Sequence, residues 1–66
     1  MKNYFIGQGT AVVKEFDTLA EMLKYHKTMQ PLDRHFCRLY DREKHRTCEG
    51  WQAWQAMNKI IPWKIW

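Results

Sequence analysis

The residue types that could do chemistry in this chain are concentrated between Arg34 and Cys48. This segment holds both cysteines, two of the three histidines and five of the eleven Lys and Arg residues. Thiolate and imidazole are ligands that zinc prefers in tetrahedral structural sites. Residues i and i+2 share a face of a strand, and residues i and i+3 share a face of a helix. The pairs His35-x-Cys37 and His45-x-x-Cys48 therefore offer the two nitrogen and two sulfur ligands of a zinc site.

The spacing of these four residues argues against a metal site. One residue separates His35 from Cys37, where about two to four are usual, and seven residues separate the two pairs. A buried cysteine usually behaves as a small hydrophobic side chain, and histidines are often solvated. We therefore predict no metal and no cofactor. A structural zinc is kept as the alternative, with the ligands His35, Cys37, His45 and Cys48.

The same side chains contain the ingredients of a nucleophilic site, in which a thiolate lies beside a base in a cleft. A small-molecule pocket needs at least ~300 Å³. A chain of 66 residues leaves little room for such a pocket, and the sequence contains no catalytic motif. We therefore predict that the protein is not an enzyme.

Positive charge is unevenly distributed along the chain. Residues 1–33 carry equal numbers of acids and bases, whereas residues 34–66 carry seven bases against three acids, so the net charge of +4 lies in the second half. This asymmetry favours an acidic partner. The leading hypothesis is a non-enzymatic inhibitor or adaptor that binds an acidic surface of a protein partner. Charge would steer the encounter, and an Arg or Trp anchor would hold the complex.

Four tryptophans lie in the last sixteen residues. Trp51 and Trp54 recur at near-helical spacing, and we expect them to pack inward, each with a partner for its indole N–H. The tail around Trp63 and Trp66 is expected to fold back as a lid or strand, with an exposed anchor as the other reading. The predicted partner-binding residues lie in the basic segment, on the polar face of the following helix and in this tail: Arg38, Arg42, Lys44, Arg46, Gln52, Gln55, Lys59, Trp63 and Trp66.

A DNA- or RNA-binding module that uses the same basic surface is the alternative function, with or without zinc. Lys and Arg hold phosphates, and glutamine can bond an adenine edge with two hydrogen bonds. Phe36 and Tyr40 share a predicted strand face with Arg38 and would form a base-stacking platform. However, Asp41 and Glu43 interrupt the basic run, and no known nucleic-acid-binding motif is present.

The elements that must position these residues follow from periodicity and turn residues. Residues 3–6 and 10–16 predict two strands, joined by Gly7-Gln8-Gly9, whose glycines permit the positive φ values of a tight hairpin. Thr18 and Glu21 have the spacing of a capping box at the start of a helix. The apolar face of that helix is expected to comprise Leu19, Met22, Leu23, His26 and Met29.

Beyond this helix, which Pro31 ends, residues 34–40 predict a third strand. Residues 41–45 predict a charged turn, and a second helix is expected to start near Thr47 or Cys48 and to run to about Asn58. The predicted order is ββαβα in one α+β domain over residues 1–66. It has an N-terminal β-hairpin, a small antiparallel sheet backed by helices, and a Trp-rich C-terminal tail.

The start of the chain also bears on location. The apolar run Tyr4-Phe5-Ile6 is broken at once by Gly7, which is not the pattern of a signal peptide, and no stretch approaches the ~20 apolar residues of a membrane span. We therefore expect an intracellular, cytoplasmic protein with reduced thiols. Self-association through an edge strand is left open. In style, as a tiny basic aromatic-rich domain without a catalytic motif, the chain is similar to small phage-encoded or accessory proteins that block a host factor.

Overall fold

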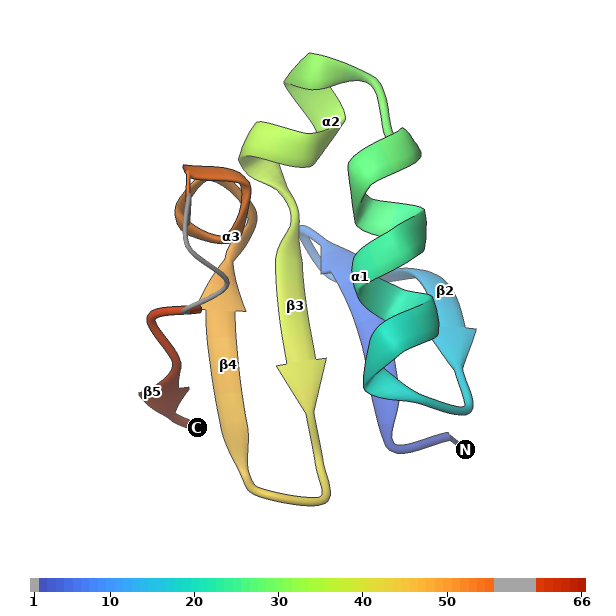
Figure 1. Cartoon of the computed structure of the whole chain (residues 1–66), viewed down its shortest axis with the longest axis vertical. Coiled ribbons are helices and arrows are strands. Elements are labelled where there is room, and N and C mark those ends of the chain that lie inside the picture. Colours follow the sequence, from blue (N-terminus) through green and yellow to red (C-terminus); the bar gives the residue numbers. More distant parts are fainter. Residues whose placement is uncertain (1, 56–60) are drawn as a thin grey trace.

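The computed structural model describes residues 2–55 and 61–66 (Figure 1). Within them, three helices accompany five strands, which form one antiparallel sheet in the order β2-β1-β3-β4-β5. In chain order the elements are β1 (Tyr4–Gln8), β2 (Ala11–Phe16), α1 (Leu19–Thr28), α2 (Pro31–Phe36), β3 (Arg38–Asp41), β4 (Arg46–Glu49), α3 (Gly50–Gln55) and β5 (Lys64–Ile65). The prediction of a small α+β domain with an N-terminal hairpin is confirmed. None of the helices among the described residues is long and apolar enough to cross a membrane.

The N-terminal hairpin depends on the two glycines on either side of Gln8. Gly9 adopts a φ of 64° in the turn between β1 and β2, in the left-handed region where a side chain would be strained. Gly7 packs against the ring of Tyr40, because a Cβ at this position would lie 3.0 Å from Tyr40 Cε2. One glycine therefore closes the turn, and the other makes room for a neighbouring strand.

Helix α1 begins at the predicted cap, where Thr18 Oγ1 accepts a hydrogen bond from the Glu21 amide at 3.2 Å. The helix buries Met22 and His26 and lies across one face of the sheet (Figure 1). The rest of its predicted apolar face packs against the buried core, which confirms that prediction: Leu19, Leu23 and Met29. The buried core itself consists of Ile6, Phe16, Met22, Cys37 and Leu39.

The prediction of a strand over residues 34–40 is wrong in its first part, where the chain forms the end of helix α2. Pro31 lies in the first turn of α2, where its fixed φ suits a helix and its missing N–H is not needed. The helix is capped by Cys37, and β3 begins at the next residue. His35 and Phe36 therefore lie on a helix and share no strand face with β3.

Residues 46–49 form a strand, although the sequence predicts the start of a helix near these positions. Strand β4 pairs with β3 in a hairpin, and α3 begins at Gly50 instead of near Thr47. Gly50 leaves no room for a side chain, because a Cβ there would clash with the Arg34 carbonyl oxygen and would lie 2.6 Å from Cys37 Sγ. The start of α3 is therefore packed directly against the end of α2. With β5, the observed order is ββααββαβ.

Side chains alternate between the two faces of the sheet. Ile6 and Leu39 pair across β1 and β3 and belong to the core, so their neighbours Phe5 and Tyr40 pair on the opposite face. Trp66 packs against both of these rings, with centroid distances of 6.0 Å to Phe5 and 5.0 Å to Tyr40. We call Phe5, Tyr40 and Trp66 the aromatic cluster. The chain thus carries a helix-covered core on one sheet face and an aromatic cluster on the other.

Candidate functional site

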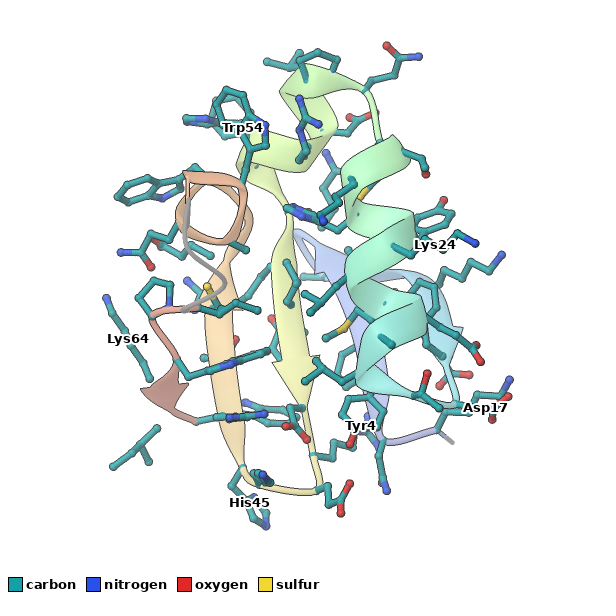
Figure 2. All side chains as sticks on the ribbon, in the orientation of Figure 1. Tyr4, Asp17, Lys24, His45, Trp54 and Lys64 are labelled. Carbon is teal, nitrogen blue, oxygen red and sulfur yellow. The ribbon has the colours of Figure 1, made fainter. Side chains whose placement is uncertain are left out.

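The four residues of the alternative zinc site are all described, and they do not form a metal site. Among the described residues, no group of three or more His, Cys, Asp or Glu side chains is placed to hold a metal ion. Cys37 and Cys48 are buried, whereas His45 is exposed in the β3–β4 turn (Figure 2) and His35 is exposed on α2. The structure therefore does not bring these four side chains together as a set of zinc ligands. The physical reason is that α2 replaces the strand that would have given His35 and Cys37 a common face.

Burial determines the protonation state of the two cysteine thiols. Desolvation raises the pKa of both Cys37 and Cys48 to about 11. Cys37 Sγ donates to the Arg34 carbonyl at 3.4 Å, and Cys48 Sγ donates to the Glu49 carbonyl at 3.3 Å. Both thiols are therefore protonated at neutral pH, and a protonated thiol is a poor nucleophile and a poor metal ligand.

Of the four basic residues predicted to bind a partner between positions 38 and 46, all but Lys44 are engaged within the protein. Arg38 Nη2 lies 3.1 Å from Glu49 Oε1 in a half-exposed ion pair. The Arg42 guanidinium lies 4.7 Å from the centre of the Phe5 ring, where it covers one side of the aromatic cluster. Lys44 is exposed in the β3–β4 turn. Only part of the positive charge that the sequence places here is therefore available to a partner.

Arg46 is bound most closely. Its Nε donates to Asp41 Oδ2 at 2.7 Å, and the Asp41 side chain is only 1% exposed. The other carboxylate oxygen, Oδ1, accepts the Lys44 backbone amide at 3.2 Å. The Arg46 guanidinium also lies over the Trp63 ring, 4.4 Å from its centre. Because a buried carboxylate needs its cation, Arg46 has a structural role in addition to any role at the surface.

The polar face predicted on the last helix is described only in part. Gln52 is half-buried on α3, and its Oε1 atom is buried without a hydrogen-bond partner among the described residues. Gln55 is the last residue of α3 that the structure describes, but its side chain and the whole of Lys59 lie outside the described residues. The role of this face therefore stays a prediction.

The tail tryptophans lie on opposite faces of the sheet. Trp63 is half-buried and packs against the core on the helix side. Trp66, a member of the aromatic cluster, is 49% exposed, and its backbone N–H donates to the His45 carbonyl at 2.9 Å. The expectation that the tail folds back as a strand is confirmed, since β5 pairs with β4.

An exposed apolar surface that the sequence predictions missed lies across α2 and α3. We call it the helical patch, and it consists of Leu32, Phe36, Trp51 and Trp54, which are 69%, 65%, 36% and 50% exposed. Figure 2 shows Trp54 projecting from α3 beside α2. Three members of the patch line a groove of about 510 Å³ together with Pro31 and His35. The largest exposed apolar side chains of the two short helices thus gather in one place.

The prediction that Trp51 and Trp54 pack inward is wrong. The inward position on α3 is taken by Ala53, which packs against the core. The Trp51 indole N–H donates to Glu49 Oε2 at 2.9 Å, and the Arg34 guanidinium lies 4.8 Å from the centre of the Trp54 ring. Both rings are thus held in position at the surface by polar neighbours.

A sequence signal for the helical patch does exist in Pro31. If this proline is taken as a first-turn residue of a new helix, Leu32 and Phe36 fall four positions apart and share one helix face. Reading Pro31 only as the end of the preceding helix removes that signal. The exposed rings of α3 cannot be found in the same way, because their direction depends on where the helix begins.

A polar cleft adjoins the apolar groove. It has a volume of about 390 Å³ and shares His35 and Phe36 with the groove. The ion pair between Arg38 and Glu49 lines this cleft. The combined surface therefore consists of an apolar groove next to a cleft that holds a paired cation and anion.

Comparisons with known proteins assign no relative. No family model matches the chain, and no curated protein or solved structure matches it. The function must therefore be inferred from the chain's own side chains and their arrangement.

Proposed function

We propose that this chain is a small non-enzymatic interaction protein, an inhibitor or adaptor, that binds an acidic protein partner through the helical patch. The observation that carries the proposal is the exposure of four large apolar side chains on two adjoining short helices. Exposed apolar patches on small proteins mark interaction sites. Tryptophan, which supplies half of this patch, is among the residues most enriched at binding hot spots.

Burial of the patch would supply the binding free energy. Fully burying one side chain of this size contributes about 1.5–3 kcal/mol. Leu32 and Phe36 are the most exposed members, so they have the most surface to lose to a partner. The two helices are already joined at their ends, where the Gly50 amide donates to the Cys37 carbonyl at 2.7 Å. A preorganised surface of this kind has a low ordering cost on binding.

The charge of the protein favours an acidic partner. The net charge is +4, and the Arg34 guanidinium borders the patch at the Trp54 ring. Lys44 and Lys64 add exposed positive charge elsewhere on the second half of the chain. A partner with carboxylates around an apolar contact would complement this surface, and long-range attraction would raise the association rate.

We also propose that the protein works in the cytoplasm. This proposal is supported by the two cysteines, which are free and buried. Free thiols are typical of reducing compartments, whereas small secreted domains usually use their cysteines in disulfides.

Nucleic acid binding is the second candidate function, and the aromatic cluster favours it. Trp66 is half-exposed on the sheet face opposite α1. Lys64 precedes it by two residues in β5, and the Arg42 guanidinium contacts the Phe5 ring of the cluster. Aromatic rings beside cations can stack on bases and hold phosphates. The Tyr40 ring, however, is already stacked on Phe5 at 4.5 Å with an interplanar angle of 8°. The Tyr40 ring therefore offers less free surface than a base-stacking platform requires.

The two candidates can be separated by capture from a nuclease-treated lysate with three immobilised baits. These are the parent protein, the double variant Phe36→Ser/Trp54→Ser and the double variant Lys64→Ala/Trp66→Ala. We expect a protein that survives nuclease treatment, is retained by the Lys64/Trp66 variant and is lost by the Phe36/Trp54 variant. The captured protein should then be purified and its Kd measured against both variants.

Salt dependence provides a second criterion. Several phosphate contacts make log affinity fall steeply with log salt concentration, whereas a buried apolar anchor loses far less. If capture is abolished by nuclease and by the Lys64/Trp66 substitutions, the chain binds nucleic acid and the protein-binding proposal is wrong.

A further inference from the structure

The groove of the helical patch is walled by helices alone. Leu32, His35 and Phe36 form one stripe on α2, because they are three and four positions apart. The groove, of about 510 Å³, is lined by this stripe, by Pro31 and by Trp54 of α3, which Figure 2 shows beside α2. All five lining residues therefore belong to α2 or α3, and no strand of the sheet borders the groove.

These walls favour a helical occupant. An extended segment laid in the groove would find no sheet edge to pair with, and its backbone N–H and C=O groups would be buried over apolar side chains without partners. A helix bonds its own backbone groups internally and presents apolar side chains at positions i, i+3 or i+4, and i+7. A helix can therefore fill the groove without that cost.

An arginine without an acidic partner borders the groove. The Arg34 guanidinium lies 4.8 Å from the centre of the Trp54 ring, and its Nη1 donates to the Lys27 carbonyl at 3.2 Å. None of the ion pairs among the described residues includes Arg34, and its Nε atom is buried there without a hydrogen-bond partner. A carboxylate brought to this guanidinium by a partner would form a charge-assisted hydrogen bond in a site that the partner shields from water.

The acids closest to Arg34 in the sequence and across the patch do not neutralise it. Asp33 faces β1, where its Oδ1 atom accepts a hydrogen bond from the Gln8 side chain at 3.4 Å. Glu49, which holds the Trp51 indole, is paired with Arg38. The charge next to the apolar groove is therefore positive.

A second copy of the chain is a poor occupant. A two-fold dimer would bring the same patch from both copies together, so two Arg34 side chains without acids would approach each other. The three rings of the patch also expose only about 300 Å² between them. Each partner in a stable complex of two folded proteins commonly contributes about 800 Å². The patch is therefore better matched to a single helix than to its own copy.

We propose that the helical patch receives one amphipathic helix of the protein partner. The apolar stripe of this helix covers Phe36 and Trp54, and a carboxylate one turn away from the stripe binds Arg34. Side chains three or four positions apart share a helix face, so one helix can supply both contacts. This inference rests on the proposed function, and it specifies the kind of segment that the partner contributes.

The test uses a phage-displayed library of unconstrained sixteen-residue peptides. The library is selected on the full chain after depletion on the double variant Phe36→Ser/Trp54→Ser. We expect enriched peptides with apolar residues at helical spacing and with Asp or Glu one turn from an apolar residue. Proline in place of a central, non-apolar position of a synthesised winner should lower its affinity by about tenfold or more, whereas alanine there should not.

The acidic contact has its own test. Arg34→Glu should lower the affinity of the winner by about tenfold and improve binding of a peptide in which lysine replaces the acid. The matched control Lys64→Glu makes the same change of charge outside the patch and should have a much smaller effect. Circular dichroism verifies that both variants are folded. If Arg34→Glu does not fold, the peptide with lysine in place of the acid, which should bind the parent more weakly, gives the answer.

Several results would overturn the inference. These are enriched peptides with apolar residues at every second position, tolerance of the central proline, a preference for basic residues, or no enrichment over the double variant. If capture from lysate still depends on Phe36 and Trp54, the proposed function stands and only the helical segment is wrong. If that dependence is absent too, both are wrong.

Discussion

Two regions of the molecule differ from what their residue types indicate. In the basic segment, residues 38–46, charged side chains are engaged within the protein, whereas the apolar side chains of the helical patch are exposed to solvent. The basic segment is charged, yet Arg46 is bound to the buried Asp41 carboxylate and to Trp63. The helical patch is apolar, yet Phe36 is mostly exposed to solvent. In each case the neighbouring residues determine whether a side chain is engaged within the protein or exposed. A buried acid engages a cation, and the small Ala53 fills the core position of α3 that a larger ring would need. Residue type alone therefore does not show which side chains are available to a partner.

The largest expected effect comes from breaking the ion pair of the basic segment. Arg46→Ala leaves the Asp41 carboxylate buried without its cation, and we expect a loss of about 3 kcal/mol of folding free energy, the lower end for a broken buried pair. Urea denaturation followed by circular dichroism measures this loss. The matched control, Lys44→Ala in the same turn, should change stability by less than about 0.5 kcal/mol. If Arg46→Ala melts like the parent, the segment is a free surface after all.

A smaller loss is expected where α3 meets α2, at the base of the helical patch. Gly50→Ala places a Cβ against the Arg34 and Cys37 backbone, so one helix must shift, and overpacking of this kind costs about 1–3 kcal/mol. The fluorescence of Trp51 and Trp54 should change at the same time. As control, Gln52→Ala in the same helix removes no such contact. A Gly50→Ala protein with parental stability would show that the two helices are not held together closely.

Acid should loosen the contact between α1 and α2. His26 is buried, and its Nε2–H donates to the Arg34 carbonyl at 3.2 Å. Desolvation lowers its pKa below the ordinary value of 6.5; the hydrogen bond to the Arg34 carbonyl offsets part of this shift, and the Arg34 charge adds to it. The unfolded chain therefore binds the proton more readily than the folded one. This contribution to stability is intact above about pH 6.5 and is lost as the pH falls through the lowered pKa of the folded state.

Unfolding experiments at about pH 7.5 and about pH 5 measure this dependence on His26. The variant His26→Gln keeps a donor near the Arg34 carbonyl but has no charge to gain, so its stability should fall less on acidification. An identical pH dependence in parent and variant would mean that other groups account for the loss.

The smallest effect on stability should come from the helical patch itself. Phe36 is mostly exposed, and Phe and Ser have similar helix propensities, so Phe36→Ser should change folding stability by less than about 0.5 kcal/mol. The buried-core control Leu39→Ala should cost about 2–5 kcal/mol. A large loss from Phe36→Ser would show that this side chain belongs to the core, and the proposed docking surface would lose its best anchor.

Local signals in the sequence were sufficient for the first half of the fold. Gly9 marks the hairpin turn, and Thr18 marks the start of α1, because a turn and a cap are each made by residues a few positions apart. Pro31 was ambiguous, since a proline both ends one helix and begins another. Strand β4 was missed because four residues carry little periodicity, and its pairing with β3 is a tertiary contact.

The prediction of the site failed for the same reason, because local sequence patterns do not show which side chains meet across the sheet. The charge of the second half was readable from composition, but the pairing of Asp41 with Arg46 follows from the β3–β4 register. The return of the tail as β5 was predicted, whereas the outward direction of Trp54 depends on α3 starting at Gly50. Contacts across the sheet therefore decide which of the predicted residues remain free.

The position of β1 in the sheet has a kinetic consequence. β1 pairs with β2, its neighbour in sequence, but it also pairs with β3, so that Tyr4 lies opposite Asp41. The hairpin can close early, whereas the β1–β3 ladder must wait for the intervening helices to bring distant residues together. Refolding should therefore be limited by the docking of β3 on β1. Substitutions in α1 should act on the refolding rate, while loss of the β5 contacts should appear mainly as faster unfolding.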